Sequence, residues 1–290
     1  MLTHFHPSPR NPDRVVLLGG SGFLGRALAE RLQAAGVETL ALSSAALNLC
    51  DSQSQGALKA ILRPSDSLVI LSALTPDRGR GIDTFMANLK MMENLCAVLP
   101  QVAPAHVVYF SSDAVYPLGT GLIHEQTPAA PTDLYGIMHR SRELMLSQVH
   151  SANLCILRPT LVYGPDDPHN SYGPNRFRRQ AAKEGKIFLG GEGEETRDHV
   201  HIHDLVEITL RVLAHRSHGV VNIATGRSVD FATVAGLVAA QFDEKVEVCP
   251  TPRTGPVTHR AFDTTELLKA FPGFGFTTLE AGIALAHRNS

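Results

Sequence analysis

Short apolar runs alternate with helically spaced apolar positions through the first half of the chain. The runs predict five buried strands, over residues 14–18, 37–42, 67–74, 106–110 and 154–157. Apolar positions three and four apart predict helices between them, over residues 23–35, 51–62, 82–99 and 134–149. Parallel neighbours in a sheet need a crossover, which is usually a helix. The rhythm therefore predicts an α/β fold with a doubly wound (Rossmann) parallel sheet.

Helix ends are also marked in the sequence. We expect Gly36 and Pro100 to end the first and third helices and Asp51 to cap the start of the second. After Pro159 the rhythm stops, and turn residues become dense between residues 164 and 174. We therefore expect a large domain over residues 14–159 and a smaller, mixed domain made mainly of residues 160–290. Residues 1–13 hold three prolines and no apolar segment, which predicts a flexible leader rather than a secretion signal.

Composition excludes several classes of protein. The 290 residues carry 26 Lys and Arg against 28 Asp and Glu, a formal charge of −2, so we expect no nucleic-acid partner. No stretch approaches the roughly 20 apolar residues that cross a bilayer, so we expect no membrane segment. The four cysteines are far apart, which argues against a disulfide framework or a Cys-type zinc site and favours the reducing cytoplasm.

A glycine-rich loop joins the first strand to the first helix. Gly19, Gly22 and Gly25 are spaced three apart and enclose Phe23 and Leu24. The first glycine suits a tight turn, the second lets a pyrophosphate approach the backbone, and the third lets the helix pack closely. A plain glycine turn is the simpler alternative, but the strand before it and the helix after it favour a dinucleotide site. The domain over 14–159 is therefore expected to bind NAD or NADP.

The end of the second strand bears on the choice of dinucleotide. An acid there usually holds the adenosine ribose, whereas an arginine accommodates a 2′-phosphate. This chain has Leu42, Ser43 and Ser44 instead. Charge at this position therefore does not separate NAD from NADP.

Three further segments lie where open α/β sheets bind ligands. Residues 111–116 follow the fourth strand, and residues 157–164 include the end of the fifth. Between them Tyr135 opens a helix, and His139, four residues later, shares its face. With these segments the chain resembles the extended short-chain dehydrogenases/reductases, the NAD-dependent epimerase/dehydratase family, over nearly its whole length. The matched features are the glycine loop, Asn88 and Asn94, Ser-Ser-Asp-x-Val-Tyr at 111–116, Tyr135 with Glu143, Arg158-Pro159, Val-Tyr-Gly at 162–164, Gly191-x-Gly193 and Arg-Asp-x-Val-His at 197–201.

The resemblance implies roles for the matched positions. Tyr135 would be the catalytic acid/base, Ser112 would bind the reacting sugar oxygen, Asp113 would be able to exchange a proton, and His139 would bind the nicotinamide ribose. The implied cofactor-binding residues are Gly19, Gly22, Phe23, Leu24, Gly25, Ser43, Asn48, Leu49, Leu71, Ala73, Asn88 and Pro159. The domain over 160–290 would hold a nucleotide-activated sugar, with the diphosphate suited to bidentate arginine pairing. The implied substrate-binding residues are Asn175, Arg176, Arg197 and Arg260.

One position departs from the family pattern. The family has Tyr-x-x-x-Lys, and its lysine holds the nicotinamide ribose and lowers the pKa of the tyrosine, whereas this chain has His139. A protonated histidine would give similar help, and a neutral one only a hydrogen bond. The enzyme then works with histidine in place of lysine, works slowly, or binds its ligands without turning them over. Arg140 and Arg142 are close in sequence, and we expect the helix to turn them away from Tyr135.

The reaction type stays open between two alternatives. Dehydratases of the family carry a glutamate base where this chain has Ala114, which disfavours water elimination. A 4-epimerase and a ketosugar reductase both remain, and a catalytically weak dinucleotide-binding protein is the alternative from another class.

Two other features of the sequence can each be explained by structure alone or by a function. His199, His201 and His203 alternate as metal ligands on a strand would, but we expect solvated histidines and no metal site. The apolar stripe over residues 82–99 is usually core, yet in the family this helix and the tyrosine helix often pair as a four-helix bundle, which implies a homodimer.

Overall fold

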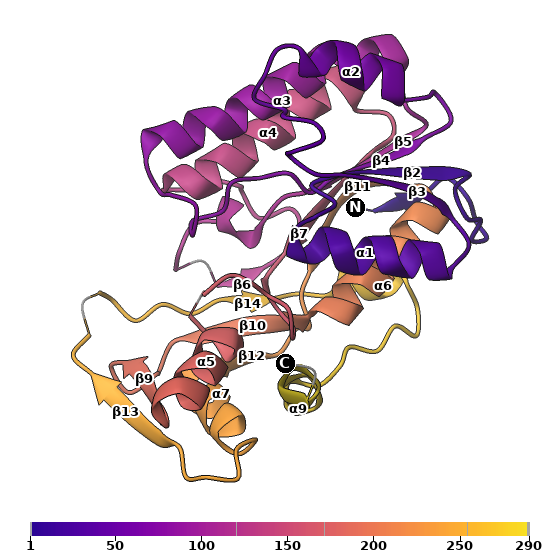
Figure 1. Cartoon of the computed structure of the whole chain (residues 1–290). Coiled ribbons are helices and arrows are strands. Elements are labelled where there is room, and N and C mark those ends of the chain that lie inside the picture. The colour runs from indigo at the N-terminus through magenta and orange to yellow at the C-terminus, as the bar shows by residue number, and fades with distance from the viewer. Residues whose placement is uncertain (1, 120, 171, 254, 289–290) are drawn as a thin grey trace.

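A seven-stranded sheet forms the centre of the molecule (Figure 1). The computed structural model describes residues 2–119, 121–170, 172–253 and 255–288. The strand order is β1-β11-β7-β5-β4-β2-β3, and every neighbouring pair is parallel except β1 with β11. The strands are β1 (Thr3–His4), β2 (Arg14–Leu18), β3 (Glu38–Leu42), β4 (Ser67–Ile70), β5 (His106–Phe110), β7 (Leu154–Pro159) and β11 (Ser217–Ile223). The expected doubly wound parallel sheet is confirmed.

Helices cover both faces of this sheet (Figure 1). Alternate residues of β2 face opposite sides, so Val15 and Leu17 join one apolar cluster while Val16 and Leu18 join the other. This burial on both sides explains the continuously apolar run in the sequence. One face is covered by α1 (Phe23–Ala34) and α6 (Ile202–Ala214), and the other by α2 (Ser54–Ile61), α3 (Ile82–Val102) and α4 (Leu134–His150).

The strand order fixes where ligands can bind. From β2 the chain moves outward to β3, and it then returns across β2 to β4 on the other side. Open α/β sheets bind ligands at such a switch point, beyond the carboxyl ends of the strands. The loops after β2 and β4 are therefore the expected walls of the cofactor site.

A smaller unit packs beyond these strand ends and has its own apolar cluster around Phe177, Ile187 and Val234. Its sheets have the orders β12-β10-β8, β13-β9 and β14-β6. The strands are β6 (Leu122–Ile123), β8 (Leu161–Tyr163), β9 (Lys186–Gly190), β10 (Thr196–His201), β12 (Ser228–Asp230), β13 (Glu247–Thr251) and β14 (Ala261–Phe262). The helices are α5 (Pro174–Glu184), α7 (Phe231–Ala239), α8 (Thr265–Ala270) and α9 (Leu279–Arg288), and a short 3₁₀ turn, η1 (Asp113–Val115), follows β5.

The structure corrects the expected division at residue 160. Strand β11 pairs with β7 in the large sheet, and α6 packs against α1 in the same apolar cluster. The leader needs correction as well, because Thr3 and His4 form a strand that pairs with β11. The His4 imidazole lies 2.8 Å from the Ser217 hydroxyl and 2.9 Å from the Ala270 carbonyl oxygen. Side-chain contacts with residues more than 200 positions away therefore fix the start of the chain.

Two helix ends also differ from expectation. Pro100 lies inside α3, which continues to Val102, because Val98, Leu99 and Val102 pack on the core and hold the last turn. Asp51 does not cap α2, because the N-cap of that helix is Gln53. The Asp51 carboxylate instead accepts a hydrogen bond from the Gln53 amide, before the helix begins. Within the described residues, none of the helices is both long and apolar enough to span a bilayer.

Candidate functional site

The glycine loop is closely packed against the segment after β4 and against the first turn of α1. Gly19 has a φ of +91°, and a Cβ there would lie 2.8 Å from the Ser72 amide nitrogen. A Cβ on Gly25 would lie 2.3 Å from the Gly19 carbonyl oxygen, so the first turn of α1 can lie against the loop only because this residue has no side chain. Gly22 is the N-cap residue of α1 and has no side chain that could accept a hydrogen bond from the first amides of the helix. Phe23 is buried and Leu24 half-buried in the first turn.

This cradle fits a dinucleotide. The first amides of α1 have no partner within the helix, and the first turn holds no acidic residue, so the helix dipole favours a phosphate there. The opposite wall is the segment after β4, which includes Leu71, Ser72 and Ala73. Buried Asn88 holds this wall in place, because its side chain accepts from the Leu74 amide at 2.9 Å and donates to the Leu74 carbonyl at 3.0 Å.

The other predicted cofactor residues surround this switch point. The Ser43 hydroxyl accepts from the Ala46 amide and closes the turn after β3. Asn48 likewise accepts from the Cys50 amide, and the side-chain amide of Asn94 donates to the Leu49 carbonyl at 2.8 Å. Pro159 is the last residue of β7, paired with Ile223 of β11. Their predicted contacts with the dinucleotide remain predictions.

Tyr135 lies in the first turn of α4, close to η1. The Asp133 carboxylate caps α4 by accepting from the Gly136 amide at 2.8 Å. A Cβ on Gly136 would lie 2.2 Å from the Ala114 carbonyl oxygen, so glycine is needed for α4 to approach η1. This approach brings Tyr135 to Ser112, which lies at the start of η1. Burial raises the pKa of Tyr135 to about 12, while hydrogen bonding with Ser112 and the charge of Arg142 oppose the rise.

His139 lies one turn below Tyr135 and is neutral. Its ring meets the Tyr135 ring edge-on, with centroids 4.7 Å apart, and its Nδ1 lies 2.8 Å from the Tyr109 hydroxyl. Burial lowers the pKa of His139 to about 3, and the nearby charge of Arg142 lowers it further. The protonated histidine considered above is therefore not the form that this site holds at neutral pH.

Arg142 corrects another expectation. Seven residues after Tyr135 is almost two helical turns, so Arg142 returns to the Tyr135 face instead of turning away from it. Its side chain is buried, donates to the Ser72 carbonyl at 2.8 Å and lies over the Tyr109 ring. The seven-residue spacing was a visible signal in the sequence. Tyr109 and Ser72 carried no comparable signal.

A buried ion pair anchors α4 to the sheet. Arg158 at the end of β7 donates twice to the Glu143 carboxylate, at 2.8 and 2.7 Å. The Ser111 hydroxyl donates to the same carboxylate at 2.7 Å, and Arg140 donates to it from the helix surface. These bonds join the ends of β5 and β7 to the helix that carries Tyr135.

On the substrate side, two predicted arginines lie near Asp113. Arg260 is 7% exposed and donates to the Asp113 carboxylate at 3.0 Å and to the Tyr116 carbonyl at 2.9 Å. Burial raises the pKa of Asp113, although Arg260 and Ser112 oppose this. Arg197 donates to the Thr258 carbonyl and hydroxyl, both at 2.7 Å. The structure therefore brings Arg260 beside the Ser112–Asp113 turn, with Arg197 in electrostatic range of both.

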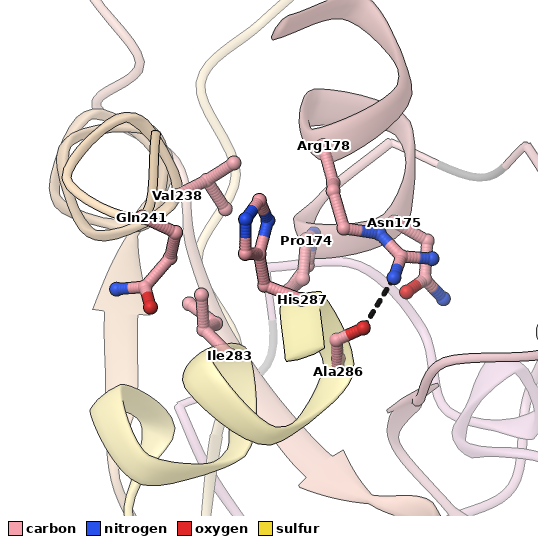
Figure 2. Close-up of a pocket in the computed structure, with 8 residues that line it drawn as sticks. All are labelled: Pro174, Asn175, Arg178, Val238, Gln241, Ile283, Ala286 and His287. Carbon is pink, nitrogen blue, oxygen red and sulfur yellow. Dashed lines mark hydrogen bonds between the residues drawn. The ribbon is translucent and has the colours of Figure 1, made fainter. Parts of the chain in front are cut away.

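The other two predicted substrate residues lie on α5. Asn175 is buried and donates to the Asp167 carboxylate, while the Arg176 guanidinium lies over the Tyr172 ring. A small cavity separates α5 from α7 and α9 beside Asn175, where Arg178 donates to the Ala286 carbonyl (Figure 2). Contacts of Asn175 and Arg176 with a substrate remain predictions.

The strand histidines are not solvated as a group. His199 and His201 are buried and only His203 is exposed, because β10 lies between β8 and β12. Burial lowers the pKa of His199 and of His201 to about 4. Over the described ranges, no group of three His, Cys, Asp or Glu side chains is arranged to hold a metal ion.

Comparisons with known proteins agree with this architecture. The dTDP-6-deoxy-L-talose 4-dehydrogenase (NAD(P)(+)) of Kitasatospora kifunensis is 29% identical over 282 residues, covering 85% of this chain and 86% of that protein. The dTDP-4-dehydro-6-deoxy-D-allose reductase of a Streptomyces species is 26% identical over 279 residues, covering 83% and 85%. The UDP-glucose 4-epimerase of Thermus thermophilus, solved with NAD, superposes with a TM-score of 0.81 at 22% identity, covering 95% of this chain and 98% of that one. The sequence model of one family matches residues 15–224, and the chain therefore belongs to the NAD dependent epimerase/dehydratase family, whose cofactor is NAD or NADP.

Proposed function

We propose that the protein is an NAD(P)-dependent oxidoreductase that acts on a nucleotide-activated sugar, with Tyr135 as its acid/base. The observation that carries this proposal is the placement of Tyr135 against Ser112, at the strand ends beside a cradle shaped for a dinucleotide. The two sequence relatives support the substrate class, since both are named for dTDP-activated sugars.

Reduction of a ketosugar is the favoured reaction. The reduced nicotinamide supplies the hydride when it is bound. The Tyr135 hydroxyl donates its proton to the carbonyl oxygen as that oxygen becomes an alcohol, while the Ser112 hydroxyl holds the same oxygen by a hydrogen bond. Burial keeps Tyr135 protonated at neutral pH, which suits a proton donor better than a base. Arg260 and Arg197 would bind the diphosphate.

Epimerisation is the second candidate, because the chain carries the Ser-Ser-x-Ala-x-Tyr segment from Ser111 to Tyr116 that is typical of epimerases. The two reactions differ in cofactor balance. A reductase consumes NAD(P)H in proportion to product, whereas an epimerase returns the hydride and shows no net consumption. Loss of NAD(P)H absorbance with a panel of dTDP- and UDP-linked 4-ketosugars therefore distinguishes them.

The acid/base assignment is tested with Tyr135→Phe. We expect kcat to fall by at least about 100-fold, the usual contribution of a positioned proton donor, with the dissociation constant of NAD(P)H unchanged. The matched control is Tyr163→Phe, which removes a buried hydroxyl that has no partner in the described part of the chain. Full turnover in Tyr135→Phe would show that another group moves the proton.

A dinucleotide-binding protein without catalysis is the alternative, and His139→Lys tests it. A gain of turnover would indicate a site repurposed from an active ancestor. A loss would show that histidine is the native partner of this site.

We also propose a homodimer formed through α3 and α4. Ile82 and Met86 on α3 and Leu144 on α4 are 70%, 55% and 54% exposed, which is unusual for apolar side chains on neighbouring helices. Leu144→Glu should shift the mass measured by light scattering to that of a monomer. Leu122→Glu, at an equally exposed apolar position on β6, should leave the mass unchanged.

All four cysteines are free, which fits a cytoplasmic location.

A further inference from the structure

Arg142 is a buried cation without a counter-ion. Arg142 is 1% exposed, and its Nη2 donates a hydrogen bond to the backbone carbonyl of Ser72. Across the described residues, its Nε has no hydrogen-bond partner and its guanidinium forms no ion pair with a carboxylate. The contact over the Tyr109 ring, at 5.2 Å, supplies only weak compensation for this charge.

Two other buried arginines show what is missing. Arg14 lies 2.6 Å from the Asp66 carboxylate, and Arg158 lies 2.7 Å from that of Glu143. Burying a charge without a partner is costly, so native proteins rarely retain one unless something else balances it. The charge of Arg142 is therefore available to an anion that forms at the site during function.

The Tyr135 side chain is the group that can become this anion. Tyr135 and Arg142 share one face of α4, with His139 between them. The acidic groups near Tyr135 are Asp113 from η1 and Asp133 before the helix, and both oppose the ionisation of Tyr135. Tyr109 from β5 and His139 are neutral, so neither offsets these negative charges. Arg142 acts in the opposite direction and favours the ionised form.

His139 supplies a hydrogen bond and no charge. Burial raises the pKa of Tyr109, so its hydroxyl stays protonated and is able to donate to the Nδ1 of His139, 2.8 Å away. In the tautomer that accepts this bond, the histidine proton lies on Nε2. That atom is buried and has no acceptor among the described residues, where the Ser72 hydroxyl and Arg142 Nε are also unpaired.

We propose that Arg142 is a positioning residue that stabilises the ionised side chain of Tyr135, and that Tyr109 holds His139 in the tautomer that presents Nε2–H to the cofactor cleft. The proposal deepens the proposed function, because it rests on Tyr135 as the proton donor. After Tyr135 gives up its proton, Arg142 stabilises the phenolate that remains. Two residues on successive turns of α4 thus divide a positive charge and a hydrogen-bond donor between them.

The charge is tested on cofactor-free protein labelled with 3,5-difluorotyrosine, whose phenol ionises at a lower pH than tyrosine. The ¹⁹F resonance of residue 135 is assigned by its loss in Tyr135→Phe and is then followed against pH. Arg142→Met should raise the Tyr135 midpoint by about one to three pH units, the usual effect of a neighbouring charge, which lowers the phenolate fraction tenfold or more. Arg142→Lys should restore the midpoint.

The matched control is Arg140→Met, which removes a partly exposed arginine from the same helix and should leave the Tyr135 midpoint unchanged. An unchanged midpoint in Arg142→Met with a lower melting temperature would assign Arg142 a structural role only and overturn the proposal. If Arg142→Met does not fold, Arg142→Gln removes the charge but keeps a polar side chain, and it should raise the midpoint in the same way. An unchanged midpoint in that variant would equally overturn the proposal.

The hydrogen bond is tested by calorimetric titration of NAD(P)H into the cofactor-free protein. His139→Phe should weaken binding by about fivefold to tenfold, the worth of one hydrogen bond, while Arg142→Lys should not. Equal affinity in His139→Phe and wild type would remove the ribose-facing role of Nε2. Neither measurement involves a sugar or turnover, so either can fail while the Tyr135→Phe test of the proposed function succeeds, and the reverse also holds.

Discussion

The predicted cofactor side and the predicted substrate side of the candidate site differ in how their polar groups are used. On the cofactor side, His139 Nε2, Arg142 Nε and the Ser72 hydroxyl are buried without partners among the residues described. On the predicted substrate side, Arg260 is bound to Asp113 and Arg197 to Thr258, and among the described residues only the Oδ1 of Asn175 is buried and unpaired in the predicted substrate set. These two predicted substrate arginines must therefore give up internal bonds before they can bind a ligand, whereas the three groups on the predicted cofactor side have no such bonds to give up.

This difference predicts an order of binding. A ligand that fills unpaired polar positions gains the full value of each hydrogen bond, because nothing is broken in exchange. A diphosphate at Arg260 or Arg197 gains only the difference between the new bonds and the ones it replaces. We therefore expect the dinucleotide to bind first and more tightly, with the sugar nucleotide second.

Acid should destabilise the whole fold, including both sides of the candidate site, and we expect this effect to be the largest. Burial lowers the pKa of His139 to about 3 and those of His106, His199 and His201 to about 4. The unfolded chain protonates these histidines below about 6.5, and the folded chain does not. The free energy of unfolding should therefore fall as the pH drops from 6.5 toward 4, at about 1.4 kcal/mol per pH unit for each histidine once the unfolded form is protonated.

Thermal unfolding across this pH range measures the loss. His106→Gln provides the comparison, since His106 bonds to the Ser217 carbonyl far from the cleft. The unfolding free energy of this variant should depend less steeply on pH, because unfolding takes up one proton fewer than in the wild type. A wild-type stability that stays level between pH 6.5 and 4 would show that these imidazoles are protonated in the folded protein.

Gly25→Ala breaks the cofactor side alone. The added methyl group would lie 2.3 Å from the Gly19 carbonyl and 2.7 Å from the Gly20 Cα, so the helix must move away from the loop. We expect the free energy of unfolding to fall by about 1–3 kcal/mol and NAD(P)H affinity to fall with it. Gly56→Ala on α2 is the control, because a Cβ there meets nothing within 4 Å, and it should stabilise the protein by up to about 1 kcal/mol.

Arg260→Gln sharpens the contrast from the substrate side. Loss of the charge-assisted bonds to the diphosphate should raise the KM for the sugar nucleotide by about tenfold. We expect this effect to be smaller than that of Gly25→Ala, because the wild-type Arg260 must itself break its bonds to Asp113 when the substrate binds. NAD(P)H affinity should not change. Arg211→Gln, at a surface arginine paired with Glu207, is the control. An unchanged KM would mean that Arg260 serves only to hold the Asp113 turn.

Local patterns predicted the elements and the cradle well. Each strand expected in the first half exists, the glycine loop joins β2 to α1, and the expected helix at residue 134 exists as α4. These features depend on neighbours within a few residues, so the sequence alone carries the information. The residues that anchor α4 were signalled by the family resemblance instead, since Glu143 and Arg158 were part of the matched motifs.

Long-range contacts were beyond local patterns. Strand β11 pairs with β7 about sixty residues earlier and with β1 more than 200 residues earlier. The burial of Arg142 was missed because charged side chains are usually solvated, and only the three-dimensional packing of Tyr109 and Ser72 around it removes the water. His199 and His201 were misjudged for the same reason.

The position of β11 has a consequence for synthesis on the ribosome. A nascent chain that has emerged only as far as residue 160 has every element of the central sheet except β11, and it exposes the whole open edge of β7. Such edges pair readily with other chains. Completion of the domain must wait until residue 223 leaves the exit tunnel, so translation pauses between these two points would favour aggregation of this protein.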